Sequence, residues 1–167
     1  MKTRPEDAPE IWRLVNESGT LDRNSAYHYL VFCKLFSDTC RVAWCGDDLA
    51  GFVTSFIPPQ HPESLFIWQV GVRQRYRGRG LGKLLIQDLL AAQTGKGVRF
   101  LEATVTPSNE RSRQLFQSLA KKWDVPIREK PCFPEELFPD GAHEAEHLFR
   151  IGPLSANSRK GKNDADF

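Results

Sequence analysis

The chain has 167 residues, a length typical of one domain rather than two. Apolar residues make up 40% of it and charged residues 26%, as in a soluble globular protein with a sizeable core. Its 23 basic and 21 acidic side chains leave a formal charge of only +2. That balance argues against a dedicated nucleic-acid-binding protein and favours a small partner.

No apolar run approaches the roughly 18 residues needed to cross a bilayer, and the first residues carry no apolar signal segment. The four cysteines form no CxxC pair and no metal-ligand spacing with histidine. We therefore expect no metal, no membrane contact, no disulfide framework and a cytoplasmic location. Cys33 and Cys45 are expected to be buried free thiols.

The first half of the chain predicts two helices and a hairpin. Apolar residues recur at helical spacing over 6–17, and a second helix follows Asn24 and Ser25, either of which can cap it. Two strands, 41–45 and 49–57, are joined by a short glycine-containing turn. The apolar face expected for the second helix consists of Tyr27, Leu30, Val31 and Leu35.

The second half predicts three further strands and two helices. Residues 65–72 are almost continuously apolar, which predicts a central strand covered on both faces. Strands are also expected over 98–105 and 147–151, whereas 123–140 gives no clear element. Two helices are expected between these strands. Their predicted inner faces are Leu81, Leu84, Leu85 and Leu89 in the first, and Ser112, Leu115, Phe116 and Leu119 in the second.

These elements predict an α/β domain over 1–154, with a mixed central sheet flanked by helices. Residues 155–167 are polar and predict a disordered tail.

Residues 75–83 form an arginine- and glycine-rich turn between the predicted central strand and the next helix. Backbone N–H groups at a helix N-terminus, with the helix dipole behind them, bind anions. Glycines let phosphate oxygens approach the main chain, and basic side chains add positive charge. The turn therefore predicts a pyrophosphate cradle. Its glycines are Gly78, Gly80 and Gly82, and its basic residues are Arg75, Arg77, Arg79 and Lys83.

The spacing within this turn separates the nucleotide-binding families. A Rossmann fingerprint needs a third glycine where Lys83 stands, and a P-loop needs four residues between its glycines, whereas three separate Gly78 from Gly82. The pattern Arg-x-x-Gly-x-Gly, from Arg75 to Gly80, resembles the coenzyme A loop of the GNAT acetyltransferase superfamily. That resemblance implies a GNAT fold that uses acetyl-CoA. The contacts it implies are Val70, Val72, Arg75, Arg77, Gly78, Arg79, Gly80, Leu81, Gly82 and Asn109.

Four further segments, 21–30, 65–70, 102–109 and 143–153, resemble the diaminobutyrate acetyltransferases of ectoine biosynthesis. The combination most specific to that family is Asp22-x-Asn24-Ser25, Trp68-Gln69 and His143-x-x-Glu146. The resemblance implies acetylation of the 4-amine of L-2,4-diaminobutyrate in a bacterium that meets osmotic stress. A separate enzyme would cyclise the product to ectoine, an osmoprotectant. By analogy with GNAT proteins of this size, we also expect a homodimer.

A primary amine, with a solution pKa near 10, is mostly ammonium at neutral pH and must lose a proton before it attacks a thioester. The resemblance implies that Glu146 is the base and that Asp22 anchors an ammonium group. The residues alone would favour a loop cap for Asp22 and a solvated acid for Glu146. The implied substrate contacts are Asp22, Tyr27, Trp68, Thr104, His143 and Glu146. Direct attack in a ternary complex needs no metal or covalent nucleophile.

Two features depart from the usual superfamily pattern. Phe116 stands where many members carry a tyrosine that protonates the thiolate, so water or another group must do so. The usual first strand is expected to be short or absent. Backbone N–H groups in 70–72 match those that stabilise the thioester oxygen. A GNAT enzyme for another amine or a peptide amine, and a non-catalytic acyl-CoA-binding module, remain alternatives.

Overall fold

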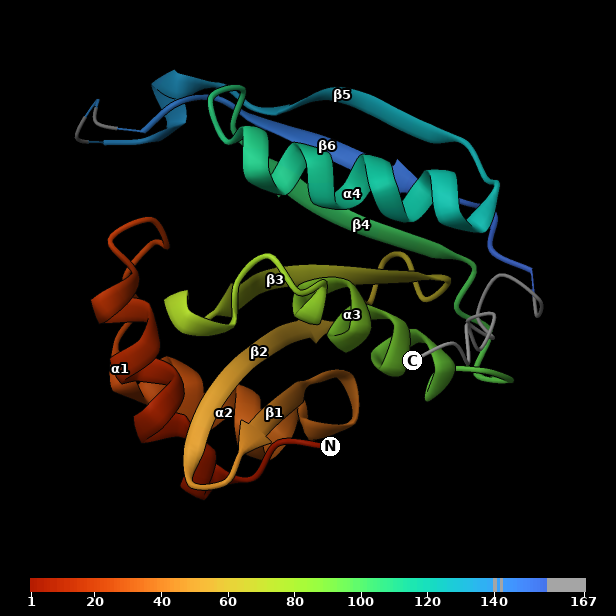
Figure 1. Cartoon of the computed structure of the whole chain (residues 1–167). Helices are drawn as coiled ribbons and strands as arrows, with labels where there is room; N and C mark the ends of the chain where they lie inside the picture. The colour runs from red at the N-terminus through yellow and green to blue at the C-terminus, as the bar shows by residue number, and fades with distance from the viewer. Residues whose placement is uncertain (140, 142, 156–167) are drawn as a thin grey trace.

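The computed structural model describes residues 1–139, 141 and 143–155. In this part of the chain six strands form one mixed sheet in the order β1-β2-β3-β4-β6-β5 (Figure 1). The predicted α/β class, with a mixed central sheet flanked by helices, is confirmed. Beyond Ser155, the predicted tail lies outside the described residues. The strands are β1 (Arg41–Cys45), β2 (Asp48–Phe56), β3 (Ser64–Val72), β4 (Phe100–Val105), β5 (Ile127–Phe133) and β6 (Glu146–Ile151). The helices are α1 (Ala8–Ser18), α2 (Ala26–Leu35), α3 (Leu81–Ala91) and α4 (Glu110–Trp123).

Helices pack on both faces of the sheet and bury two apolar clusters. α3 and α4, in front of the sheet in Figure 1, cover one cluster that extends across β2, β3, β4 and β6. α1 and α2 cover the other against β1 and β2. Neighbouring residues of β2 alternate between the clusters, since Phe52 faces α1 and α2 while Val53 faces α3 and α4.

The two halves of the sheet separate along the boundary between β3 and β4. These parallel strands pair from Ser64 opposite Phe100 to Ile67 opposite Ala103, and their pairing ends there. β3 continues to Val72 with β2 as its strand partner. In Figure 1 the strands run together at the right and part toward the left. The β4-facing backbone of β3 beyond Ile67 therefore has no strand partner among the described residues and can bond to a ligand.

A β-bulge changes the direction of the side chains just beyond this point. Thr54 and Ser55 are adjacent on β2, but they pair with Gln69 and Ile67, so Trp68 is an extra residue on β3. Ile67 belongs to the cluster under α3 and α4, whereas the side chain of Gln69 reaches Tyr29 of α2 on the opposite face. The prediction that β3 is covered on both faces is wrong at Trp68, whose side chain is 48% exposed.

Helix α2 begins as predicted but buries a different face. Ser25 is its N-cap and accepts a hydrogen bond from the backbone N–H of His28. The buried residues are Tyr29, Phe32 and Cys33, whereas Tyr27, Leu30 and Leu35 of the predicted inner face are exposed. The helix is apolar around most of its circumference, so periodicity could not select the packed side.

The inner faces of the two later helices are confirmed in part. In α3, Leu85 and Leu89 are buried but Leu84 is 58% exposed, because α3 packs on the sheet with Leu85, Ile86, Leu89 and Leu90. In α4, Phe116 and Leu119 are buried, while Ser112 and Leu115 are partly exposed at the edge of a cleft described below.

Strand β5 lies in a region where the sequence predicts no element. It pairs antiparallel with β6 at the edge of the sheet. Charged residues and Pro131 interrupt the apolar alternation of β5. Such residues are common on edge strands, where they hinder pairing with other chains. The charged residues and the proline that protect this edge therefore also remove the apolar alternation by which a strand is predicted from sequence.

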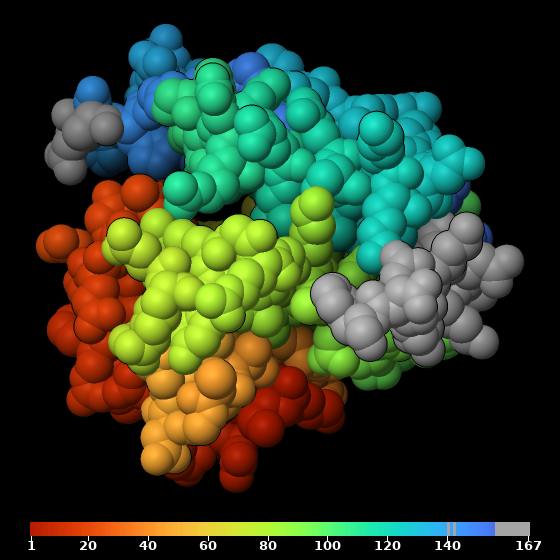
Figure 2. All heavy atoms as spheres, viewed as in Figure 1, coloured from red at the N-terminus to blue at the C-terminus, as the bar shows by residue number. Residues whose placement is uncertain are grey.

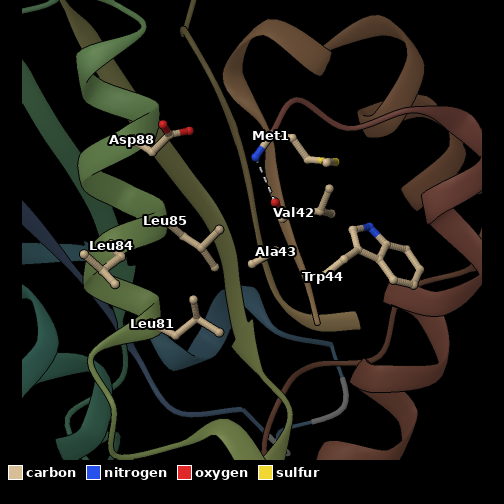
Figure 3. Close-up of a pocket in the computed structure, with 8 residues that line it drawn as sticks. All are labelled: Met1, Val42, Ala43, Trp44, Leu81, Leu84, Leu85 and Asp88. Carbon is tan, nitrogen blue, oxygen red and sulfur yellow. Dashed lines mark hydrogen bonds between the residues drawn. The ribbon is translucent and has the colours of Figure 1, made fainter. Parts of the chain in front are cut away.

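The opposite edge confirms that the first strand is short. Lys2 makes an isolated bridge with Arg41, and Met1 exchanges two 3.0 Å backbone hydrogen bonds with Val42. Beyond these contacts, a groove of about 330 Å³ separates the edge of β1 from α3, with Leu84 and Asp88 on its helical side (Figure 3).

Two of the four cysteines are buried. Burial raises the pKa of Cys33 to about 12 and that of Cys40 to about 11, so both thiols act as apolar packing groups. The prediction for Cys45 is wrong: it is exposed, because β1 ends there and the chain turns into the hairpin. Cys132 is partly buried.

Candidate active site

The glycine-rich turn is shaped for an anion by its backbone. Gly78 and Gly80 have φ angles of 77° and 74°, in the left-handed region that favours glycine. Gly80 is the N-cap of α3, whose first turn has no acidic residue and whose cap makes no side-chain hydrogen bond. The first N–H groups of α3 are therefore available to a phosphate, and the helix dipole favours that negative charge.

A cleft of about 970 Å³ opens beside this turn, where β3 and β4 part. Figure 2 shows a hollow between the yellow-green atoms of the turn and α3 and the teal atoms of α4. Its volume is at the upper end of the range for small-molecule sites, which is roughly 300–1,000 Å³. Of the predicted coenzyme contacts, those that line the cleft are Val70, Val72, Arg77, Gly78, Gly80, Leu81, Gly82 and Asn109.

The basic side chains of the turn point in different directions. Arg77 lines the cleft and donates from Nε to the carbonyl of Val72 at 2.9 Å. Arg75 instead pairs with Asp48 on β2, with Nε 2.8 Å from Oδ2. Arg75 and Arg79 are not among the lining residues, so their coenzyme contacts stay predictions. Arg111 of α4 lines the cleft and was not predicted.

Gly82 and Asn109 line the cleft at the N-terminal ends of α3 and α4. A β-carbon on Gly82 would lie 3.7 Å from Val70 and 3.8 Å from Val72, which is ordinary van der Waals contact, so packing against β3 does not require glycine there. Asn109 is the N-cap of α4, and its Oδ1 accepts a hydrogen bond from the backbone N–H of Ser112 at 3.1 Å. Asn109 also lines the cleft, so capping and the predicted pantetheine contact are compatible.

Four predicted acceptor residues from three separate parts of the chain come together. Nε2 of His143 lies 3.7 Å from Oδ2 of Asp22 and 3.6 Å from Oε1 of Glu146. Thr104 is the first residue of β4 beyond its pairing with β3, and its side chain hydrogen-bonds to Glu146. We call Asp22, Thr104, His143 and Glu146 the acidic cluster.

Within the acidic cluster the two carboxylates have different surroundings. The Glu146 side chain is only 16% exposed, and its Oε2 has no hydrogen-bond partner among the described residues. Burial raises the pKa of Glu146, although the charge of His143 and the Thr104 hydrogen bond oppose this shift. The Asp22 side chain is 83% exposed. One carboxylate is therefore suited to accept a proton and the other to attract a cation.

His143 is held from several sides. Its Nδ1 lies 2.7 Å from the backbone carbonyl of Glu144, a bond that raises the pKa of His143, and the charges of Asp22 and Glu146 raise it further. The ring stacks on Phe138 with centroids 4.2 Å apart. Both oxygens of Glu144 bond to Ser108, which precedes α4 and lines the cleft. These contacts were not predicted, because they join loops without sequence periodicity.

Trp68 and Tyr27 lie on the side of the sheet that α2 covers. The indole of Trp68 is 5.5 Å from the ring of His28, and the next residue, Gln69, donates to the carbonyl of Asp22 at 2.8 Å. Trp68 therefore precedes, along β3, the residue that contacts the Asp22 loop. Tyr27 is 74% exposed on the first turn of α2, and no hydrogen bond or ring contact joins it to the acidic cluster among the described residues.

An apolar residue occupies the position where many members of the superfamily carry a tyrosine that protonates the thiolate. Phe116 is 3% exposed and packs edge-to-face on Phe149, so it contributes no proton donor to the cleft. The hydroxyl groups that line the cleft belong to Ser108, Ser112 and Ser118, among others.

Within residues 1–139, 141 and 143–155, no group of three or more acidic, histidine or cysteine side chains could hold a metal ion. No helix there is long and apolar enough to span a membrane.

A mixed sheet that parts beside a glycine-rich anion turn defines the class of GNAT acyltransferase folds. The model of the acetyltransferase (GNAT) family matches residues 8–120, more than half of the chain. Ard1 from Thermoplasma volcanium shares the fold, with a TM-score of 0.71 at 18% identity, covering 91% of this chain and 95% of that one.

Several proteins with higher sequence identity to this chain are diaminobutyrate acetyltransferases. The L-2,4-diaminobutyric acid acetyltransferase of Shouchella clausii is 49% identical over 154 residues, covering 91% of this chain and 86% of the relative. That of Halalkalibacterium halodurans is 48% identical, covering 92% and 80%. The diaminobutyrate acetyltransferase of Paenibacillus lautus, solved with L-2,4-diaminobutyric acid and coenzyme A, has a TM-score of 0.87 at 40% identity, covering 92% and 93%. The chain therefore belongs to the GNAT family and, within it, to the L-2,4-diaminobutyric acid acetyltransferases.

Arg77→Ala should weaken coenzyme binding, because it removes a positive charge from the wall of the cleft. We expect the Kd for coenzyme A, measured by calorimetry, to rise about tenfold, as for loss of one charge-assisted phosphate contact. Arg128→Ala, on the exposed edge strand β5, removes the same charge far from the cleft and should leave the Kd unchanged. Equal effects of both substitutions would mean that only net charge matters.

Glu146→Gln should stabilise the fold while it slows the reaction. The raised pKa of Glu146 means that folding favours the protonated carboxyl, so the ionised form destabilises the protein at neutral pH. We expect a higher Tm at pH 7 and a difference that disappears below the ordinary value of 4.5. Turnover should fall by about a hundredfold, with acetyl-CoA affinity unchanged. A lower Tm at pH 7, or unchanged turnover, would contradict this role.

Proposed function

We propose that this chain transfers the acetyl group of acetyl-CoA directly to the 4-amino group of L-2,4-diaminobutyrate within a ternary complex. One observation carries the proposal: the acidic cluster lies where β4 leaves β3, and the coenzyme cleft opens along the same parting. A thioester entering along the cleft thus meets an amine held by carboxylates. A separate enzyme would then cyclise the product to ectoine.

On the coenzyme side, the diphosphate lies at the N-terminus of α3, with Arg77 and Lys83 beside it. The pantetheine arm follows the unpaired edge of β3, where backbone groups at Val70 and Val72 face the cleft. A backbone N–H of this edge stabilises the thioester oxygen as it becomes anionic. Phe116 gives no proton, so water or a cleft hydroxyl protonates the departing thiolate.

On the acceptor side, diaminobutyrate carries two ammonium groups and one carboxylate. Asp22, exposed and 3.7 Å from His143, attracts an ammonium group. Glu146, partly buried and with no hydrogen-bond partner for its Oε2 among the described residues, accepts a proton from the 4-amine directly or through one water molecule. Its raised pKa brings it nearer to the working pH of a general base. In this proposal Thr104 and His143 orient Glu146, and Tyr27 and Trp68 enclose the rest of the substrate.

The alternatives differ in the acceptor. Ornithine and lysine carry the same charged groups as diaminobutyrate, but on chains one and two methylene groups longer. We expect CoA release, followed with a thiol reagent, to be at least about tenfold faster in kcat/KM for diaminobutyrate than for ornithine. NMR of the product should place the acetyl group on the 4-nitrogen. Equal rates with all three amines would refute the substrate; no release with any amine would favour a non-catalytic acyl-CoA-binding module.

We also propose a homodimer, a cytoplasmic location and a catalytic domain formed by residues 1–154. The free, buried thiols of Cys33 and Cys40 suit a reducing compartment. Support for pairing comes from α2, where the side chains of Leu30 and Leu35 are exposed, because exposed apolar surface commonly marks an interface.

Pairing through α2 can be tested by the mass of the protein in solution. Light scattering should give twice the 19.0 kDa chain mass, and Leu30→Glu should give the monomer. Leu84→Glu, an equally drastic change at an exposed leucine of α3, should leave the dimer intact. A monomeric unsubstituted protein, or dissociation by Leu84→Glu alone, would contradict this arrangement.

A further inference from the structure

The loop that carries Asp22 is fixed at two adjacent residues. Leu21 packs into the apolar cluster beneath α1 and α2. It also lies above Gly71 of β3, where a β-carbon would be only 3.0 Å from the leucine side chain. The next residue, Asp22, accepts a 2.8 Å hydrogen bond at its backbone carbonyl from Nε2 of Gln69. The Asp22 carboxylate is thus exposed, while its backbone is held.

Gln69 is itself fixed by a buried hydroxyl. Tyr29 of α2 is fully buried, and its hydroxyl donates to Oε1 of Gln69 at 2.9 Å. Gln69 is 8% exposed, so both ends of its amide are satisfied in an almost dry environment. Tyr29 accepts a further 3.4 Å hydrogen bond from Asn24, in the same loop as Asp22. The order Tyr29 to Gln69 to Asp22 forms a relay from α2 through β3 to the loop.

The bulge at Trp68 makes this relay possible. In a regular strand Gln69 would lie on the same face as Ile67, under α3 and α4. The extra residue turns Gln69 to the face of Tyr29 instead, and returns Val70 to the cleft. The bulge therefore directs two neighbouring side chains of β3 to opposite faces of the sheet. Gln69 reaches the loop that carries Asp22, and Val70 lines the coenzyme cleft.

We propose that Gln69 is a positioning residue that sets the Asp22 carboxylate opposite His143, and that Tyr29 acts through it. The inference rests on the proposed function, because it assigns Gln69 to recognition of the diaminobutyrate ammonium group. Gln69 is 8% exposed and is not among the residues that line the cleft. It acts through the backbone of Asp22, whose Oδ2 lies 3.7 Å from Nε2 of His143.

Kinetics with both substrates test the relay. Gln69→Leu removes the donor and the acceptor but keeps apolar bulk, and we expect the KM for diaminobutyrate to rise about tenfold, as for loss of one buried hydrogen bond. Tyr29→Phe keeps the ring and should give a smaller rise, of about threefold. The KM for acetyl-CoA should change less than about twofold in both, because the cleft wall is intact.

A matched control separates positioning from general stability. Thr39→Val removes another buried hydroxyl, which donates to the carbonyl of Ser55 at 2.7 Å in a different part of the fold. It should lower the Tm as Gln69→Leu does, yet leave the KM for diaminobutyrate unchanged. If Thr39→Val raises that KM equally, or if the Gln69 variants change both KM values together, the positioning role is wrong.

A double-mutant cycle with Asp22→Asn decides whether Gln69 acts through Asp22. In the Asp22→Asn variant, the further substitution Gln69→Leu should raise the KM for diaminobutyrate by less than about twofold. The reason is that the Asp22 charge, which Gln69 positions, is already absent. Fully additive effects would overturn the inference. If the unsubstituted protein does not acetylate diaminobutyrate, the proposed function fails first. If it does, and Gln69→Leu leaves its KM unchanged, only the relay fails.

Discussion

The parting of β3 from β4 after Ile67 and Ala103 is the constraint on which both halves of the site depend. Up to that point the strands share a parallel ladder and one apolar cluster, which joins the two halves of the sheet. Beyond it, β3 follows β2 and β4 follows β6. The cleft is therefore a consequence of strand pairing, and the glycine-rich turn and the loop before α4 complete its lining.

Opposite charges gather on the two sides of this parting. The coenzyme side presents helix N–H groups with Arg77 and Lys83, and suits an anionic diphosphate. The acceptor side presents Asp22 and Glu146, and suits an ammonium group. The formal charge of +2 conceals this separation, because it sums all 23 basic and 21 acidic side chains of the chain. Local arrangement of charge, rather than net charge, thus distinguishes the two substrates.

Sequence patterns predicted most of the elements, because buried faces impose a period. The α1 helix, the β1–β2 hairpin and β6 lie where they were expected. The face of α2 and the bulge in β3 were missed, because α2 is apolar on two sides and the apolar run 65–72 hides an extra residue. Strand β5 was missed because it follows no apolar alternation.

The site residues also divide into those that local sequence patterns could predict and those that only tertiary contacts bring together. The coenzyme turn could be found from spacing, because its glycines and its helix start are consecutive. That Asp22, His143 and Glu146 would meet followed only from resemblance, since they are brought together by tertiary contacts. Glu144, Phe138 and the Gln69 relay carry no local signal, because each acts through one long-range contact.

The surroundings of Glu146 indicate that it is present for chemistry rather than for folding. The partly buried carboxylate of Glu146 costs stability, because its Oε2 is buried without a hydrogen-bond partner among the described residues to replace the lost hydration. Strand β6 needs no acid at its first residue, since its pairing with β4 and β5 uses the backbone. A fold that only needed to be stable would place an apolar residue there, or a polar residue whose buried atoms are all hydrogen-bonded. In the proposed reaction a cationic amine offsets this cost when it binds beside Glu146, so the same burial that weakens the fold would favour the substrate.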